Sequence, residues 1–178
     1  MKFFSFVLVG SLALLAACNQ SQPSAAPPSA SAPTPELPYL TNAQPRLQTI
    51  KLFVGAQTLV TELAMTPQQL ATGMMWRTNM PDGEAMLFVF SVPHRTSFYM
   101  RNTKVPLSAA YIDPEGVIQE IHDLHPLKEE PVEATSDNIQ FVLEVPQGWF
   151  KRHNISTGAL VRTQFGDMKR SFTFKPGR

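Results

Sequence analysis

The chain has 178 residues and nearly balances its charges, with 15 Lys and Arg against 14 Asp and Glu and a formal net charge of +1. Proteins that bind nucleic acid carry a basic excess that is missing here, so we expect no nucleic-acid partner. Because the chain contains a single cysteine, no disulfide can form within it, and stability has to come from packing.

The N-terminus has the pattern of an export signal. Lys2 precedes an apolar run, Phe3 to Ala17, which ends in small residues before Cys18. A membrane-spanning helix needs roughly 20 apolar residues, so an uncleaved transmembrane anchor is the weaker interpretation. Residues 15–18 resemble the lipobox of bacterial lipoproteins, which implies cleavage before Cys18 and attachment of lipid to its thiol. We therefore expect residues 1–17 to be a lipoprotein signal peptide.

Lipidation predicts where the protein resides. Two or more acyl chains hold a protein durably on a membrane, so we expect export and anchoring to the bacterial cell envelope through Cys18. By resemblance to the sorting rule of enteric bacteria, an Asp at the next position would favour the inner membrane. The residue there is Asn19, which favours the periplasmic face of the outer membrane.

Residues 18–46 are expected to form a disordered tether that begins with the lipidated cysteine. The segment consists mostly of Ser, Pro, Ala, Gln and Thr, and it holds seven of the 16 prolines. With almost no charged or aromatic side chains, it cannot build a core. A flexible coil of this length spans roughly 30 Å, which separates a folded domain from a bilayer.

The pattern of residues 47–178 predicts a single, mainly β globular domain of compact sandwich or barrel type, with one or two short helices. Short apolar or alternating runs are separated by turn residues about every ten positions. Gly55 is expected to supply a positive φ in the first hairpin, and residues 113–116 have the pattern of a β-turn. Strands are expected at 48–54, 57–64, 86–92, 107–112, 117–122, 138–145, 159–165 and 171–174, the third of them buried on both faces.

Two short helices are expected in this domain. Thr66, Pro67 and Gln69 have the pattern of a capping box with proline at the first helical position. Gly73 is expected to end this helix in a left-handed conformation. The second helix is expected at 149–153, after a glycine.

Three segments concentrate residues that ordinary strands do not need: 73–77, 97–103 and 143–149. The first two combine aromatic and Met side chains with an arginine, and the second adds an amide and a hydroxyl. This mixture suits a concave site in which rings and Met contact a ligand while a few polar groups orient it. The candidate ligand-binding residues are Arg77, Tyr99, Arg101, Asn102, Thr103 and Glu144.

A structural interpretation of the same residues stays open. Met often fills gaps in cores, and Asn102 with Thr103 could serve only to shape a turn. Glu144 could serve only to pair with Arg77 or Arg101.

Four segments occur in a specific order: 73–77, 85–90, 98–103 followed by Pro106-Leu107, and 142–148. They resemble the motifs Gly-Leu-Met-x-Arg, Gly-Met-Leu-Phe-x-Phe, Phe-Trp-Met-x-Asn-Thr and Val-Leu-Glu-x-x-x-Gly of the domain of unknown function family 192. The resemblance covers about residues 47–165 and implies a compact, mostly β, sandwich-like fold that is often exported, without an established activity. The chain departs from the motifs at Ala85, Tyr99 and Ser108, where relatives have Gly, Trp and, in many cases, Asp.

Catalytic interpretations depend on other residues. Nucleophilic catalysis is disfavoured, because Cys18 is used for lipid and no Gly-x-Ser-x-Gly elbow occurs. Glycoside hydrolysis needs two carboxyl groups roughly 5–10 Å apart. Glu144 with Asp113 or Glu84 are the candidates for such a pair, and we expect no catalytic residue beyond this alternative.

A metal site is a further alternative. His122, Asp123 and His125 have a spacing that could hold a metal, although a solvated loop before Pro126 is the more ordinary interpretation. We expect neither a resident metal nor a cofactor. The two remaining histidines, at positions 94 and 153, are expected on the surface.

These observations favour a membrane-anchored binding module for a saccharide or another small envelope ligand. An envelope hydrolase that uses Glu144 and a scaffold or assembly lipoprotein are the alternatives. The sequence leaves the oligomeric state open.

Overall fold

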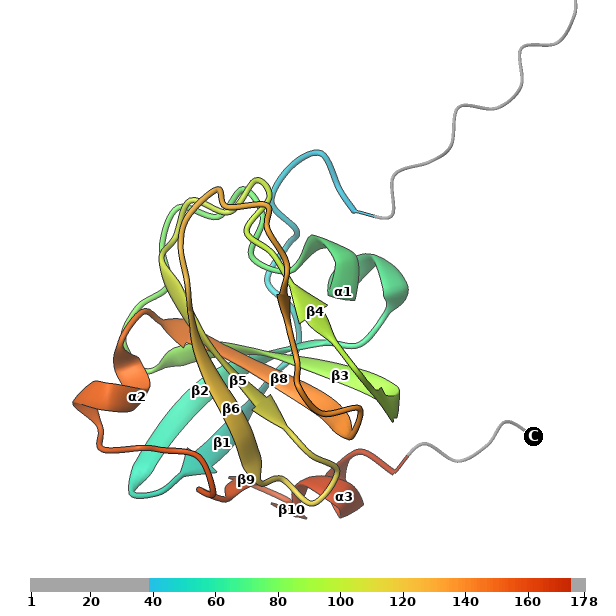
Figure 1. Ribbon diagram of the computed structural model, residues 1–178, viewed down its shortest axis with the longest axis vertical. Coiled ribbons are helices and arrows are strands. Elements are labelled where there is room, and N and C mark those ends of the chain that lie inside the picture. Colours follow the sequence, from blue (N-terminus) through green and yellow to red (C-terminus); the bar gives the residue numbers. More distant parts are fainter. Residues whose placement is uncertain (1–38, 174–178) are drawn as a thin grey trace, which may run out of the picture. The chain divides into compact units, whose positions relative to one another are not determined.

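The computed structural model describes residues 39–173, which belong to one compact unit (Figure 1). The predicted signal peptide, Cys18 and the tether up to residue 38 lie outside the described residues. The described part is mostly strand, and its three helices are short, which confirms the prediction of a mainly β domain. Within residues 39–173, no helix has both the length and the apolar character needed to cross a bilayer.

The described chain contains ten strands and three helices. The strands are β1 (Thr49–Val54), β2 (Gln57–Ala64), β3 (Glu84–His94), β4 (Ser97–Phe98), β5 (Leu107–Ile112), β6 (Ile118–Leu124), β7 (Val132–Glu133), β8 (Ile139–Pro146), β9 (Val161–Thr163) and β10 (Gly166–Asp167). The helices are α1 (Pro67–Thr72), α2 (Trp149–Arg152) and α3 (Met168–Ser171).

Eight strands form one mixed sheet in the order β10-β9-β1-β2-β3-β8-β5-β6. β2 and β3 pair in parallel, and the other neighbours pair antiparallel. β4 and β7 form a separate two-stranded sheet. The strand β8 therefore lies inside the large sheet, between β3 and β5, and both of its edges are hydrogen-bonded.

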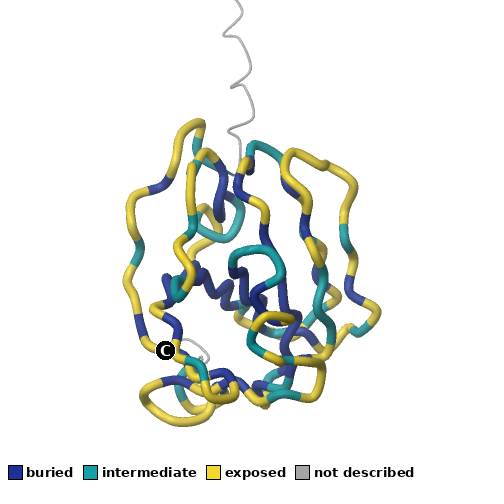
Figure 2. Tube along the Cα trace, turned by 90° about the vertical axis from the view of Figure 1, so that its left-hand side faces the viewer, coloured by how far each residue is buried: buried dark blue, intermediate teal, exposed yellow. Residues whose placement is uncertain are grey.

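Apolar cores lie on both faces of the large sheet. Leu143 and Val145 of β8 belong to one core, together with Trp149 and Phe150 of α2. Val142 of the same strand belongs to the other core, on the side of α1. Figure 1 shows α1 and α2 on opposite sides of the domain, and Figure 2 shows the buried stretches of the strands inside a shell of exposed loops.

The predicted turns and helix start are confirmed. Gly55 has φ +59° in the β1–β2 turn, and the amide of Gly116 donates to the carbonyl of Asp113 at 3.0 Å between β5 and β6. At the start of α1 the backbone of Gln69 donates to Thr66 Oγ1, while the Gln69 side chain accepts from the backbone of Thr66. The local sequence therefore sets these boundaries, as capping predicts.

Gly73 ends α1 differently from the expectation. Its φ is positive, at +46°, but its ψ is −128°, so it is not in the left-handed helical conformation. A Cβ at this position would lie 2.9 Å from the ring of Phe88. Glycine is needed here because the aromatic ring packs directly against the backbone.

Two strand predictions are corrected. The expected strand 86–92 is part of the longer β3, but burial covers only Ala85–Val89, and Val92 is 63% exposed. The expected strand 171–174 is wrong where it is described, because α3 occupies Met168–Ser171. The Asp167 carboxylate accepts from the amide of Arg170 at 2.7 Å, which starts a helix in place of a strand.

Contacts with the folded domain begin before residue 47. The amide of Leu40 donates to Thr72 Oγ1 at 3.0 Å, and the buried side chain of Gln44 donates to the carbonyl of Gly73 at 2.8 Å. Residues 40–44 thus run along the end of α1, at the side of the domain that holds the site described next.

Candidate functional site

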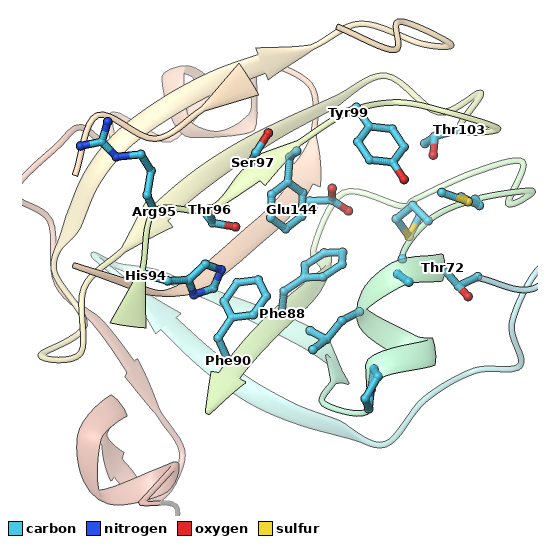
Figure 3. Close-up of a pocket in the computed structure, with 17 residues that line it drawn as sticks. Thr72, Phe88, Phe90, His94, Arg95, Thr96, Ser97, Tyr99, Thr103 and Glu144 are labelled. Carbon is cyan, nitrogen blue, oxygen red and sulfur yellow. The ribbon is translucent and has the colours of Figure 1, made fainter. Parts of the chain in front are cut away.

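A pocket of about 450 Å³ lies between α1 and the end of β3. Its volume is in the range of small-molecule sites. One wall comes from α1 and the turn after it, and the opposite wall from the chain between β3 and the small β4–β7 sheet. The lining consists of Pro67, residues 70–75, Phe88, Phe90, residues 94–99, Thr103 and Glu144 (Figure 3).

Glu144 reaches this pocket from the middle of β8. Its backbone lies between those of Met86 on β3 and Ala109 on β5, so the side chain starts from the most enclosed part of the sheet. Only 5% of the residue is exposed, and its Oε2 atom is buried without a hydrogen-bond partner among the described residues. In Figure 3 the carboxyl group points into the space bounded by Tyr99, Thr103 and Phe88.

Burial raises the pKa of the Glu144 carboxyl to about 8. At neutral pH the group is therefore mostly protonated and can both donate and accept a hydrogen bond. Buried polar groups nearly always have partners in folded proteins. An unpartnered carboxyl group that faces a cavity is therefore the feature that most strongly marks this pocket as a site.

Aromatic rings form much of the lining. The rings of Phe88 and Phe98 meet edge to face with centroids 4.8 Å apart, and Phe90 meets His94 in the same way at 4.5 Å. His94 is therefore partly buried in the lining, where a surface position was expected. These packed rings give the pocket a rigid apolar wall.

Tyr111 closes the sheet side of this region. It lies on the same face as Glu144, two residues beyond Ala109 on β5, and its hydroxyl donates to the carbonyl of Val132 at 2.6 Å. Burial first, and then the charges of Glu144 and Glu120, raise the pKa of Tyr111 above its usual range. Because this hydroxyl already donates to Val132, it does not donate a hydrogen bond to Glu144.

Three of the six predicted site residues come together in the lining: Tyr99, Thr103 and Glu144. Tyr99 is 39% exposed at the edge of the pocket, and Figure 3 shows its hydroxyl pointing into the pocket. Thr103 is buried, and its hydroxyl donates to the carbonyl of Arg101 at 3.2 Å. That these three residues bind a ligand remains a prediction.

Arg77 lies outside the lining and is paired. Its guanidinium donates to both carboxylate oxygens of Glu62, at 2.5 and 2.8 Å. Burial alone raises the pKa of Glu62, but the hydrogen bonds from Arg77 and from the amide of Leu47 outweigh it and lower that pKa below its usual value. The pair holds β2 to the turn after α1.

Arg101 and Asn102 also lie outside the lining. Arg101 pairs with Glu129 at 2.7 Å on the surface and lies over the ring of Tyr99, 5.6 Å from its centroid. Asn102 has φ +56°, its carbonyl accepts from the amide of Trp76 at 2.8 Å, and its side-chain nitrogen lies 4.0 Å from the sulfur of Met75. Asn102 thus shapes the turn that supports the pocket wall.

Most of the lining was not among the predicted site residues. Phe88 and Phe90 lie in a run that indicates a buried strand, and their sequence context gives no sign of a cavity. The α1 residues 70–72 likewise have the pattern of an ordinary short helix. The segments 73–77 and 97–103 and the isolated acid in the apolar run of β8 provided the signal that could be read from the sequence, and Gly73, Met74 and Met75 of the first segment line the pocket.

The alternative catalytic residues lie elsewhere. Glu84 pairs with Arg46 at 2.9 Å, and Asp113 accepts from the amide of Val117 in the β5–β6 turn. Among the described residues that line the pocket, Glu144 is the sole carboxyl group.

Two of the three metal candidates, His122 and Asp123, make other contacts. His122 pairs with Glu120 at 2.9 Å, and Asp123 accepts from Ser108 Oγ, which in turn accepts from the amide of Gly148. Within residues 39–173, no group of three His, Cys, Asp or Glu side chains is arranged to hold a metal ion.

Two solved bacterial proteins have a similar fold. One, from Sinorhizobium meliloti 1021, is described as a candidate transcription regulator; it has 27% identity and a TM-score of 0.64, and the match covers 68% of this chain and 98% of that one. The other, from Novosphingobium aromaticivorans DSM 12444, is described as a protein of unknown function. It has 31% identity and a TM-score of 0.63, with 65% of this chain and 86% of that one covered.

Comparison with curated proteins gave no match. The model of the family DUF192, described as Uncharacterized ACR, matches residues 50–163, which span every strand from β1 to β9 and include the whole pocket lining. This chain therefore belongs to the DUF192 family, whose function is not known.

Proposed function

We propose that this domain is a binding module for a small organic ligand, held at the bacterial cell envelope by lipid on Cys18. The observation that carries the proposal is the buried, unpartnered carboxyl group of Glu144 in an aromatic pocket of about 450 Å³. A carboxyl group without a partner is costly to bury. A ligand that supplies the missing hydrogen bond recovers part of that cost on binding.

Among small organic ligands, the lining favours a saccharide. The rings of Phe88, Phe98 and Tyr99 offer apolar surface for the flat faces of sugar rings. Hydroxyl groups of Thr72, Thr96, Ser97 and Thr103 supply the polar groups that fix orientation.

Binding is better supported than hydrolysis. A carboxyl group with a raised pKa could act as a general acid. Glycoside hydrolysis, however, needs a second carboxyl group nearby, and Glu144 is the one carboxyl group among the described residues of the lining.

The test is an NMR titration of the soluble domain with glucosamine, N-acetylglucosamine and their disaccharides. Saturable shifts confined to the amides of the lining would support the proposal. Ala71→Phe adds a ring to the lining from α1 and should remove binding, whereas Gln68→Phe, on the same helix outside the lining, should preserve it. Equal binding by both variants would place the ligand elsewhere and contradict the proposal.

Anchoring is tested separately. Cys18→Ser should move the protein from the membrane fraction of its bacterial host to the soluble fraction. Mass spectrometry of the native protein should find diacylglycerol on the Cys18 thiol and no residues 1–17. A bare thiol, or a retained leader, would contradict anchoring without affecting the proposal for the pocket.

A further inference from the structure

Glu144 has a buried carboxyl oxygen for which the described protein supplies no donor. Its Oε2 atom has no hydrogen-bond partner. The arginines of the neighbouring motifs are used elsewhere, because Arg77 pairs with Glu62 and Arg101 pairs with Glu129. The described side chains therefore leave this oxygen to a donor from solvent or from a ligand.

The aromatic rings around Glu144 attract cations, as a carboxylate does. The faces of aromatic rings are negative and attract cations, and Phe88, Phe98 and Tyr99 all contribute to the lining. The thioethers of Met74 and Met75 add polarizable, uncharged surface. A cation is favoured here by both the acid and the rings.

Basic groups of the pocket do not neutralise Glu144. His94 packs against Phe90, and in Figure 3 the side chain of Arg95 extends away from the carboxyl group of Glu144. The other titratable groups near the Glu144 carboxyl are Tyr99 and Tyr111. The hydroxyl of Tyr111 donates a hydrogen bond to the carbonyl of Val132. Met86 on β3 and Ala109 on β5, the strand neighbours of Glu144, carry no charge.

We infer that the ligand carries a protonated amine, which donates hydrogen bonds to the Glu144 carboxylate between the aromatic rings of the pocket. The inference rests on the proposed function, because it assigns the ligand chemistry of the same site. An ammonium group offers three donors in a compact volume, so one contact supplies both the missing donor and the cation that the rings attract. Amino sugars and other small amines belong to this class.

Binding of such a cation is coupled to a proton. With a pKa of about 8 in the free protein, Glu144 has to lose its proton before it pairs with an ammonium group. At pH 7 each amine bound should release about 0.9 proton, and affinity should rise about tenfold per pH unit between pH 6 and pH 7.5 before levelling above pH 8. A neutral ligand of the same shape should release no proton.

Cyclohexylamine and cyclohexanol provide a matched pair of probes, since they share one ring and differ in charge. Isothermal titration at pH 6 to 8.5, in buffers of different ionisation enthalpy, measures affinity and proton release together. We expect cyclohexylamine to bind at least tenfold more tightly than cyclohexanol at pH 8. Glu144→Gln should remove that preference and the pH dependence, while Glu133→Gln, an exposed acid on β7, should leave both unchanged.

Equal affinities of the two probes at pH 8, or preference for the amine without proton release, would overturn the inference. The same holds if cyclohexylamine fails to bind at 10 mM. The proposed function is judged independently, because saccharide shifts that Ala71→Phe abolishes would retain the pocket as a binding site even if the amine has no advantage.

Discussion

The domain contains two buried glutamates whose surroundings differ. Glu62 on β2 receives two hydrogen bonds from Arg77 and one from the amide of Leu47, and its pKa is lowered. Glu144 on β8 has no partner for Oε2, and burial raises its pKa to about 8. One acid is thus part of the structure and stays charged, whereas the other is left uncompensated beside a pocket.

This difference indicates that Glu62 serves the stability of the fold and Glu144 its function. A fully paired buried acid is needed by the protein itself, because its loss leaves the half-buried guanidinium of Arg77 without a partner. An unpaired acid weakens the fold at neutral pH, and proteins tolerate such costs mainly at functional sites. Changing each acid in turn tests whether the two glutamates differ in this way.

The largest effect is expected for Glu62→Gln. This change leaves the guanidinium of Arg77 without its carboxylate and weakens the contact with the amide of Leu47. Removing one partner of a buried pair costs about 4 kcal/mol of unfolding free energy. Urea denaturation at pH 7 measures it, and a loss below about 1 kcal/mol would show that the pair contributes little.

The opposite sign is expected for Glu144→Gln. The folded-state pKa of Glu144 lies above its unfolded value of 4.5, so the native state holds a proton that the unfolded state has lost between pH 4.5 and about 8. Its contribution to stability is therefore complete below pH 4.5 and is lost as pH rises to about 8. Relative to the wild type, Glu144→Gln should be similar at pH 4.5 and more stable by about 3 kcal/mol at pH 7.

Urea denaturation of both proteins from pH 4.5 to pH 9 provides the check. A constant difference across that range would mean that Glu144 does not titrate with a raised pKa. A loss of stability at pH 9 would mean that its carboxylate has a partner.

A smaller effect is expected at the α1 wall of the pocket. Thr66→Ala removes the side chain that accepts from the amide of Gln69, and loss of such a cap costs about 1 kcal/mol. Because α1 forms one wall, ligand affinity should fall slightly along with the melting temperature. Thr66→Ser keeps the cap and should restore both, and failure of Thr66→Ser to do so would show that the hydroxyl is not what holds the wall.

The smallest effect is expected for Glu129→Gln. Its pair with Arg101 lies on the surface, with half-exposed side chains, and such pairs are weak. The melting temperature should shift by less than about 2 °C, and probe binding should not change. A tenfold loss of affinity would show that Arg101 contributes to ligand binding.

The turns and the N-cap of α1 could be predicted from sequence because their causes are local. Gly55, Thr66 with Gln69 and residues 113–116 form the expected turns and cap, and a short helix follows Gly148 as expected. The parallel pairing of β2 with β3, and the position of β8 between β3 and β5, depend on contacts between distant segments. No local pattern carries that information.

Site residues could be predicted only where a residue type is unusual for its strand or belongs to a motif. Glu144 stands out because an acid interrupts an apolar strand, and Tyr99 and Thr103 stand out through their motif. Arg77 was a reasonable candidate by composition, but its partner Glu62 lies 15 residues earlier on β2, and nothing between them predicts the pair. Phe88 and Phe90 could be assigned to a strand but not to a cavity, because the α1 side of the pocket comes from elsewhere in the chain.

The role of Glu144 is tested most directly by a carbon-13 NMR titration of its side-chain carboxyl, with the signal assigned through Glu144→Gln. We expect a pKa near 8 in the free domain, and a marked fall when saturating cyclohexylamine is present. A pKa near 4.5 that cyclohexylamine does not move would show that the carboxyl group is already solvated or paired, and would contradict its role as the recognition group of the pocket.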